Sequence, residues 1–479
     1  MKGWFFIVAI LIQFVNTGFA QPNFETEINH LLEKPDYESA IVGIRIEDLK
    51  NDEIVFDLNG DKLLIPASTL KLITTATALE ILGSNYRFKT LIGYTGKIKD
   101  EKLEGDLVVI GGGDPTLGSE YFESENFNPH FLDVWAEKIR EAGVQKVNGN
   151  LVMDASIYDT EKIPDTWIWE DMGNYYGAGA NAFTVYDNLF RINFSSPKRA
   201  GELTRIISIE PNIKGLEFNN EVISSDINKD LAYVFGSPLD KTRIIKGSIP
   251  KNRNSFIVKA SIPKPEELLA EDLLKHLAQK GVFVSGKIVF DKAASSKINL
   301  IYINESPALS EIVKVLNFES VNLFAEHLLK QISAEKTGIG NRENSIELIS
   351  EYWKSKGFPV EKLIMEDGSG LSHFNAVTPE FFVSVLKYMY HSENSDVFQK
   401  SLPGAGDGTL TGFNKLHFPD ESIKAKSGSM TRVRCYVGYL KTDSGKDFCF
   451  SVMFNQFIGS QSQIGNEIEN ILLDLRKFY

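Results

Sequence analysis

Residues 66–72 read PASTLKL, and they open a segment whose pattern predicts a helix over residues 66–82. Proline suits the first turn of a helix, and a glycine directly after the last apolar residue is a common end signal. Ser68 and Lys71 are three residues apart, so they share one face at the start of this helix. A lysine kept partly neutral by burial and a nearby positive charge can take the serine proton, while the positive helix end and the Ser68 backbone N–H favour an oxyanion. The alternative is a surface helix start in which a hydroxyl residue is only a cap.

A second motif, Ser320-Val321-Asn322, lies between two predicted helices. Positions i and i+2 of a regular helix point about 200° apart, so both polar side chains reach one site only if they stand in a turn. Taken alone, the motif is equally consistent with a cap for the helix that begins near Leu323.

A third motif, Lys426-Ser427-Gly428, lies on a strand predicted over residues 421–429. Alternation along a strand places Lys426 and Gly428 on the same face. The lysine offers a cation there, and the absent side chain of the glycine lets an extended peptide lie along the strand edge. A charged, twisted edge strand is the alternative interpretation.

The three motifs in this order resemble those of the penicillin-recognising acyl-serine enzymes. The first interval, from Ser68 to Ser320, leaves room for a large insertion. The chain is therefore similar to the D-alanyl-D-alanine carboxypeptidase/endopeptidase family, the class C low-molecular-mass penicillin-binding proteins (penicillin-binding protein 4 type), which carry two extra domains in that interval. Further stretches that resemble this family are residues 112–117, 167–171, 367–372 and 408–410.

The resemblance implies an α+β fold. It consists of a penicillin-binding transpeptidase-like catalytic domain, with an antiparallel sheet flanked by helices and a helical subdomain, and two nested inserted domains. The resemblance also implies that Ser68 is the nucleophile and Lys71 its base. Ser320 relays the proton to the leaving amine, Asn322 orients the substrate amide, and Lys426 supplies positive potential.

The resemblance also implies which residues bind the substrate. Lys426 and Ser427 hold its terminal carboxylate, although the family usually has threonine at the second position. The backbone N–H groups of Ser68 and Ser429 form the oxyanion hole, and Gly428 borders the substrate strand. The residues expected near the substrate's side-chain pocket are Met430, Asp154 and Tyr158. No cofactor and no metal is implied.

The expected activity is serine DD-carboxypeptidase or DD-endopeptidase action on the stem peptides of peptidoglycan, with β-lactam antibiotics as inhibitors. Two alternatives remain open. One is a β-lactamase or esterase of the same fold, and the other is a cell-wall binding protein without catalysis. The four polar residues Ser68, Lys71, Ser320 and Lys426 favour an enzyme, because a binding module does not need all of them.

Charge and length limit the partners and the location. The 479 residues include 51 Lys and Arg against 64 Asp and Glu, a formal net charge of −13, which disfavours nucleic acid and anionic membrane surfaces as partners. Residues 1–20 have the form of a secretory signal cleaved before Gln21, so we expect an exported, periplasmic protein. A retained anchor is the alternative. No second apolar run is long enough to span a bilayer, so no stable membrane insertion is expected.

Changes in pattern along the chain predict its domains. A helix, Gly-Val and a strand that ends in Asp occur twice, at 131–154 and 267–291, which suggests two related units of one inserted domain. The predicted divisions are a signal peptide (1–20), a catalytic domain (21–84 and 305–479), an inserted α/β domain (85–185 and 263–304) and a nested strand-rich domain (186–262).

Several other features carry less weight. Cys435 and Cys449 lie out of register in two neighbouring predicted strands, so no disulfide is expected. The seven histidines lack the spacing of a metal site. Tyr186-Asp187-Asn188 matches the YxN motif of class C β-lactamases. It falls in the insertion, however, and Ser320 of the second motif already fills the role that its tyrosine would have.

Overall fold

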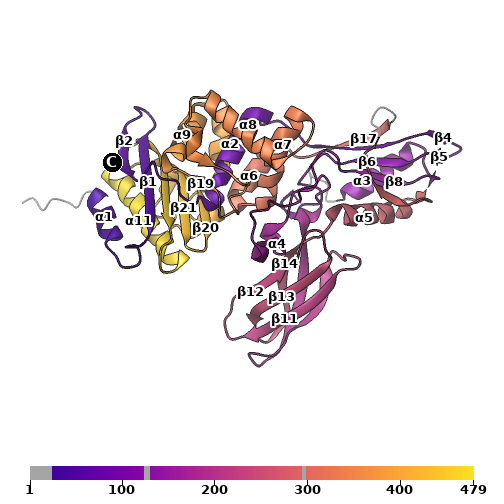
Figure 1. Cartoon of the computed structure of the whole chain (residues 1–479), viewed down its shortest axis with the longest axis horizontal. Helices are drawn as coiled ribbons and strands as arrows, with labels where there is room; N and C mark the ends of the chain where they lie inside the picture. Colours follow the sequence, from indigo (N-terminus) through magenta and orange to yellow (C-terminus); the bar gives the residue numbers. More distant parts are fainter. Residues whose placement is uncertain (1–23, 123–129, 294–297) are drawn as a thin grey trace, which may run out of the picture.

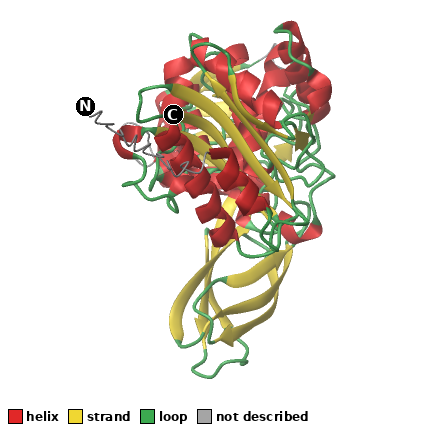
Figure 2. Cartoon of the chain, turned by 90° about the vertical axis from the view of Figure 1, so that its left-hand side faces the viewer, coloured by secondary structure: helices red, strands yellow, loops and turns green. Residues whose placement is uncertain are grey.

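The computed structural model describes residues 24–122, 130–293 and 298–479. The expected signal peptide and its cleavage site lie outside the described residues. Figure 1 shows an antiparallel sheet with helices at one end of the molecule, a smaller α/β part at the other end, and a strand-rich part that projects below. In the view turned by 90°, these projecting strands stand clear of the helical body (Figure 2).

The first sheet is antiparallel throughout, and its predicted strands at 433–441 and 447–455 are confirmed. Its spatial order is β2 (Ile54–Leu58), β1 (Ile41–Asp48), β22 (Asp447–Asn455), β21 (Val433–Lys441) and β20 (Ile423–Met430). The apolar sides of α1 (Phe24–Leu32) and α11 (Gln461–Phe478) share a core with one face of this sheet. The other face packs against α9 (Pro379–His391) and the helical subdomain. Almost every residue of β22 is buried, as expected for a strand that is covered on both faces.

The helical subdomain positions the first two motifs. The helix predicted over 66–82 begins as a 3-10 turn, Ala67–Leu70, and continues as α2 (Lys71–Leu82). Its neighbours are α6 (Leu309–Glu319), α7 (Asn322–Thr337), α8 (Arg342–Ser355) and α10 (Ser395–Lys400), with the short strands β18 (Leu363–Ile364) and β19 (Ala376–Val377). Every residue of α2 from Lys71 to Leu79 is buried, so this helix runs through the core and is not a surface helix.

The α/β part contains two sheets beside α3 (Phe131–Glu141) and α5 (Pro265–Gln279). One sheet has the order β16 (Ile288–Phe290), β8 (Leu151–Asp154), β6 (Leu107–Ile110), β3 (Lys89–Tyr94) and β17 (Asn299–Glu305). The other has the order β15 (Phe283–Val284), β7 (Lys146–Val147), β5 (Lys102–Glu104) and β4 (Lys97–Lys99). The strands of the two repeated units pair in parallel, β7 with β15 and β8 with β16, so these units lie side by side.

The strand-rich part consists of two three-stranded sheets. One has the order β10 (Arg205–Glu210), β9 (Leu189–Ser196) and β14 (Arg253–Ser261). The other has the order β11 (Glu217–Ser225), β13 (Thr242–Pro250) and β12 (Leu231–Phe235), and β12 lies beside the short helix α4 (Trp169–Met172). A single hydrophobic core runs through this part and the α/β part.

Cys435 and Cys449 are both free and buried, which confirms the prediction that they form no disulfide. Their registers explain why: Cys435 lies opposite Met453, and Cys449 lies opposite Tyr439. Among the helices of the described ranges, none combines the length and the apolar character that crossing a bilayer requires.

Candidate active site

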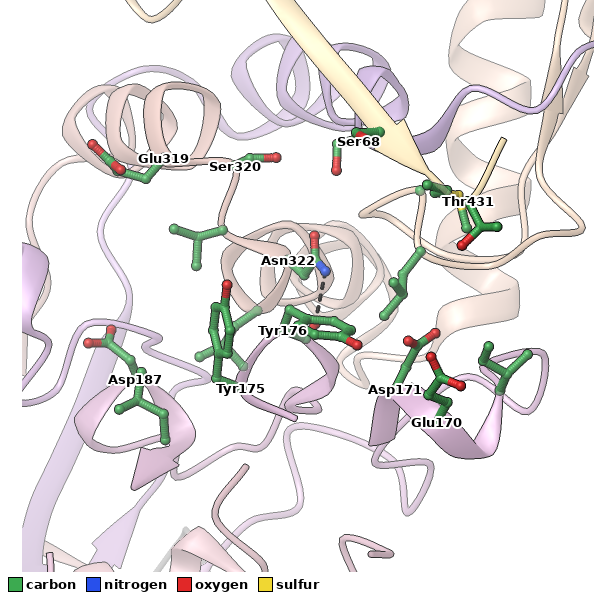
Figure 3. A pocket seen from close by; sticks show the side chains of 18 of the residues that line it. Ser68, Glu170, Asp171, Tyr175, Tyr176, Asp187, Glu319, Ser320, Asn322 and Thr431 are labelled. Atoms are coloured by element: carbon green, nitrogen blue, oxygen red, sulfur yellow. Dashed lines mark hydrogen bonds between the residues drawn. The ribbon is translucent and has the colours of Figure 1, made fainter. Parts of the chain in front are cut away.

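A cavity of about 440 Å³ opens where the sheet that contains β20, the helical subdomain and the α/β and strand-rich parts meet. Ser68, Ser320 and Asn322 line it from the catalytic half, as do Ser429 and Met430. Figure 3 shows Ser68 and Ser320 at one side of this cavity, with Tyr176 opposite them and Glu170 and Asp171 toward one end. The structure therefore brings residues of the first two motifs and the end of the third motif's strand to one cavity.

Lys71 lies directly beneath Ser68 and is fully buried. Its Nζ lies 2.9 Å from the Ser68 Oγ, 2.6 Å from the Asn322 Oδ1 and 2.6 Å from the Ser369 carbonyl oxygen. The last two atoms can only accept hydrogen bonds. A neutral amine has two N–H donors, which these two acceptors use, so its lone pair remains for the hydroxyl proton of Ser68.

Burial is the main reason that the pKa of Lys71 falls from 10.5 to about 7, and the nearby carboxylates of Asp367 and Glu326 oppose this fall. Glu326 is itself buried, and desolvation followed by the charge of Asp367 raises its pKa to about 8. The Glu326 carboxylate accepts hydrogen bonds from the backbone N–H groups of Gly368 and Ser369. Lys71 can therefore be neutral near neutral pH, as a general base must be.

Asp367 holds the loop whose Ser369 carbonyl meets Lys71. Its carboxylate accepts hydrogen bonds from the backbone N–H groups of Gly370 (2.7 Å) and Ser372 (2.6 Å). It also accepts one from the indole N–H of Trp167, at 2.8 Å. Trp167 belongs to the inserted region, so the insertion helps to fix the loop behind the amine.

Ser320 and Asn322 stand at the turn that their spacing predicts. Ser320 ends α6 with a left-handed backbone (φ 61°), and Asn322 is the first residue of α7. Asn322 accepts a hydrogen bond from Lys71 and donates one from its Nδ2 to the Tyr176 carbonyl oxygen, at 2.8 Å. The dashed line in Figure 3 marks the second of these bonds, which joins the catalytic half to the insertion.

The third motif lies on β20, beside the turn that carries Ser68. Lys426 is fully buried, its Nζ donates to the Ser427 carbonyl oxygen at 2.8 Å, and burial, then the charge of Lys71, lowers its pKa well below 10.5. A Cβ atom at Gly428 would lie 2.6 Å from the Pro66 carbonyl oxygen and 3.1 Å from the Ser68 nitrogen. The missing side chain therefore lets β20 approach the turn that carries Ser68. This contact explains the glycine more directly than the space for a substrate strand that the sequence suggested.

Asp154 and Tyr158 do not line the cavity. The Asp154 carboxylate accepts hydrogen bonds from the backbone N–H groups of Ser156 and Ala293, and the Tyr158 hydroxyl donates to Gln331. Of the residues expected for the side-chain pocket, the structure brings only Met430 to the cavity.

Asp171 and Tyr176 do line the cavity, and Asp171 lies toward one end of it (Figure 3). Burial raises the pKa of the Asp171 carboxyl, and a hydrogen bond with Tyr176 opposes that rise. The sequence stretch 167–171 resembled the family, but it carried no signal of which residue faces the substrate. Glu326 and Asp367 were missed for a similar reason, since only the packing of α7 against the loop at 367–372 brings them behind Lys71.

Further polar contacts fasten the insertion to the helical subdomain. Lys330 of α7 forms an ion pair of 2.7 Å with Asp159, and Arg342 of α8 forms one of 2.9 Å with Glu161. Both basic side chains are nearly buried.

Asp187, from the Tyr186-Asp187-Asn188 match, lies at the opposite end of the cavity from Asp171 (Figure 3). Its carboxylate accepts a hydrogen bond from the Glu120 backbone N–H. In the described ranges, no three His, Cys, Asp or Glu residues are grouped as a metal site requires.

Comparisons with known proteins agree with this geometry. A family model described as the D-Ala-D-Ala carboxypeptidase 3 (S13) family matches residues 24–474. A D-alanyl-D-alanine carboxypeptidase of Actinomadura sp. (strain R39) is 27% identical over 90% of this chain and 81% of its own length. The D-alanyl-D-alanine carboxypeptidase DacB of Haemophilus influenzae is 25% identical over 94% of this chain and 91% of its own.

The fold is also found among solved structures. Penicillin binding protein 4 (dacB) from Haemophilus influenzae superposes with a TM-score of 0.80 at 23% identity, over 92% of this chain and 97% of its own. The same protein, complexed with a β-lactam, superposes with a TM-score of 0.76 at 22% identity over the same shares of the two chains. The expected α+β, penicillin-binding transpeptidase-like fold is thereby confirmed.

Proposed function

The chain belongs to the D-Ala-D-Ala carboxypeptidase 3 (S13) family, and from this membership we propose that it is a periplasmic serine DD-carboxypeptidase and DD-endopeptidase of peptidoglycan. The observation that carries the proposal is the position of the Lys71 amine, within hydrogen-bond reach of the Ser68 hydroxyl and of two acceptors that use its N–H donors. Such an amine is a base directed at one hydroxyl, which is the requirement for serine acyl transfer.

Acylation begins when neutral Lys71 takes the proton of Ser68 and the Ser68 Oγ attacks the carbonyl carbon between two D-residues. The backbone N–H groups of Ser68 and Ser429 stabilise the oxyanion, and a donor of this kind is typically worth about 3–4 kcal/mol of barrier. The C–N bond then breaks, and Ser320 passes the proton to the leaving amine. Water hydrolyses the resulting ester and regenerates Ser68.

The charges of the site support this choice of substrate. Lys426 and Ser427 of β20 hold the terminal carboxylate of the stem peptide, whose negative charge opposes the fall in the pKa of Lys426 and favours its charged form. At the other end of the cavity, Glu170 and Asp171 suit a substrate side chain that bears an ammonium group. A β-lactam would acylate Ser68 and leave slowly. The complex of the Haemophilus influenzae relative with a β-lactam supports that inhibition.

The test is to label the mature protein and its Ser68→Ala variant with a fluorescent penicillin. We expect labelling of the wild type only, and equal labelling of both proteins would refute the assignment of the nucleophile. Rapid turnover of the penicillin would instead indicate a β-lactamase. Incubation with defined muropeptides measures the two proposed activities separately, as D-Ala released from a pentapeptide and as monomers released from a cross-linked dimer.

A further inference from the structure

The sheet β11–β13–β12 of the strand-rich part has one buried face and one face toward solvent. Val222, Val234 and Ile245 point into the core. Because side chains alternate along a strand, Ile223, Leu231 and their register partners point the other way. We call this second surface the outer face, and its apolar and aromatic members are Leu203, Ile223, Leu231, Tyr233, Phe235 and Ile244.

The outer face places several partly exposed apolar and aromatic side chains among polar ones. Leu203, Ile223 and Leu231 lie in one row across the sheet, joined through Ser248, and are exposed by 59%, 41% and 39%. Tyr233 follows two residues after Leu231 on the same strand and is exposed by 41%. These side chains form a small apolar patch at the edge of the cavity that Tyr233 lines.

The outer face continues directly into the active-site cavity. Tyr233 lines the cavity together with Ser68. The next aromatic on β12 is Phe235, whose ring lies 6.2 Å from that of Trp169 of α4 in a tilted arrangement. Trp169 lies between Ile168 and Glu170, two residues that also line the cavity. A ligand that leaves the cavity along β12 therefore meets aromatic and aliphatic side chains without a break.

Size and charge limit what can occupy this surface. The row across the strands and the length along β12 each span about 13–14 Å, an area of about 180 Å². This is far below the ~800 Å² per partner of a stable protein interface. Lys246 and Glu221 of the face form an ion pair of 3.4 Å, and Glu217 on the same side of β11 adds a negative charge, so the face does not attract an anionic membrane.

We propose that the outer face is a docking surface for the glycan strand of peptidoglycan. The inference rests on the proposed function, because a stem peptide in the cavity is covalently joined to this glycan. The four residues between the scissile bond and the sugar reach at most about 14 Å when extended, so the glycan must lie close to the cavity mouth. Pyranose rings present apolar C–H faces that pack on aromatic and aliphatic side chains, while their hydroxyl groups remain in water.

The experiment compares a polymeric with a soluble substrate. The variant is Ile223→Ser with Leu231→Ser, two exposed positions that do not line the cavity. The matched control is Ile207→Ser with Ile257→Ser, on the other sheet of the same strand-rich part and similarly exposed. Binding to intact sacculi and to glycan strands stripped of peptide is measured in the inactive Ser68→Ala background, and D-Ala release from a soluble pentapeptide is measured with Ser68 intact.

We expect the outer-face variant to bind sacculi and stripped glycan at least fivefold more weakly than wild type, and the control to bind like wild type. Both should release D-Ala from the soluble pentapeptide within twofold of wild type. Unchanged glycan binding, equal losses in the control, or binding to anionic lipid vesicles in place of glycan would overturn the proposal. If the wild type releases neither D-Ala from a pentapeptide nor monomers from a cross-linked dimer, the proposed function fails, and the glycan measurement in the Ser68→Ala background remains a separate result.

Discussion

The surroundings of Ser68 and the outer face of the strand-rich part differ in where they put polar and apolar groups. Around Ser68, Lys71, Glu326 and Asp367 are buried, and each is held by several hydrogen bonds. On the outer face, aliphatic and aromatic side chains are partly exposed to water. Reactivity needs the first arrangement, because burial is what shifts a pKa, and docking needs the second. The effects of substitution should therefore decrease from the buried cluster to the outer face.

Loss of the buried amine should have the largest effect. Lys71→Met keeps most of the side-chain volume and removes the base, so we expect penicillin acylation to slow by about 10³-fold or more. The measurement is the second-order rate constant for labelling with a fluorescent penicillin. Lys97→Met, on the exposed strand β4, is the control and should label like wild type. Acylation by Lys71→Met within tenfold of wild type would rule out its role as base.

The pH dependence of acylation tests the same amine without a mutation. Burial lowers the pKa of Lys71 to about 7, and only the neutral form accepts the Ser68 proton. Below pH 7 the neutral fraction falls tenfold per unit, so we expect the acylation rate at pH 5 to be about a hundredth of its plateau above pH 8. Stopped-flow labelling across this range measures it. A flat profile, or one that rises toward acid, contradicts the assigned base.

Loss of the hydrogen bond between Trp167 of the insertion and Asp367 should have a moderate effect. Trp167→Phe removes the N–H donor to the buried Asp367 carboxylate, and such a bond to a charged group contributes about 1.5–3 kcal/mol. We expect that loss in the free energy of unfolding, measured in urea, together with slower acylation because the Ser369 carbonyl shifts. Trp169→Phe is the matched control, since this second indole is exposed and should cost less than about 0.5 kcal/mol. Equal losses in the two variants would show that the hydrogen bond does not support the site.

How much of this could be predicted depended on whether a signal was local. Spacing alone predicted that Ser68 and Lys71 share a face and that Ser320 and Asn322 stand in a turn, because helix geometry fixes both. The residues of the substrate's side-chain pocket had no such local signal. Asp154 ends a strand as predicted, but the strand turns its carboxylate toward backbone N–H groups, and the segment that reaches the cavity comes later, at Asp171.

The same limit applies to the buried acids and to the outer face. Glu326 lies one helical turn beyond Asn322, and nothing in the sequence says that a loop some forty residues later supplies its N–H donors. Strand alternation predicts two faces for β11, but only the sheet order shows that Ile223 and Leu231 fall in one row. Partners that are distant in sequence were therefore beyond prediction, whereas the local geometry of each motif was not.

The smallest effect is expected for a substitution on the outer face. Ile223 allows a direct comparison, because the preceding residue, Val222, is buried in the core. Ile223→Ser should cost about 1 kcal/mol or less of the free energy of unfolding, since its side chain is 41% exposed and loses only part of its packing. Val222→Ser, one residue earlier and fully buried, should cost about 2–3 kcal/mol, through the lost packing and the buried hydroxyl. Urea unfolding of both variants measures the difference. A loss in Ile223→Ser that approaches the loss in Val222→Ser would mean that another surface covers the outer face in solution, which would leave no room for a glycan.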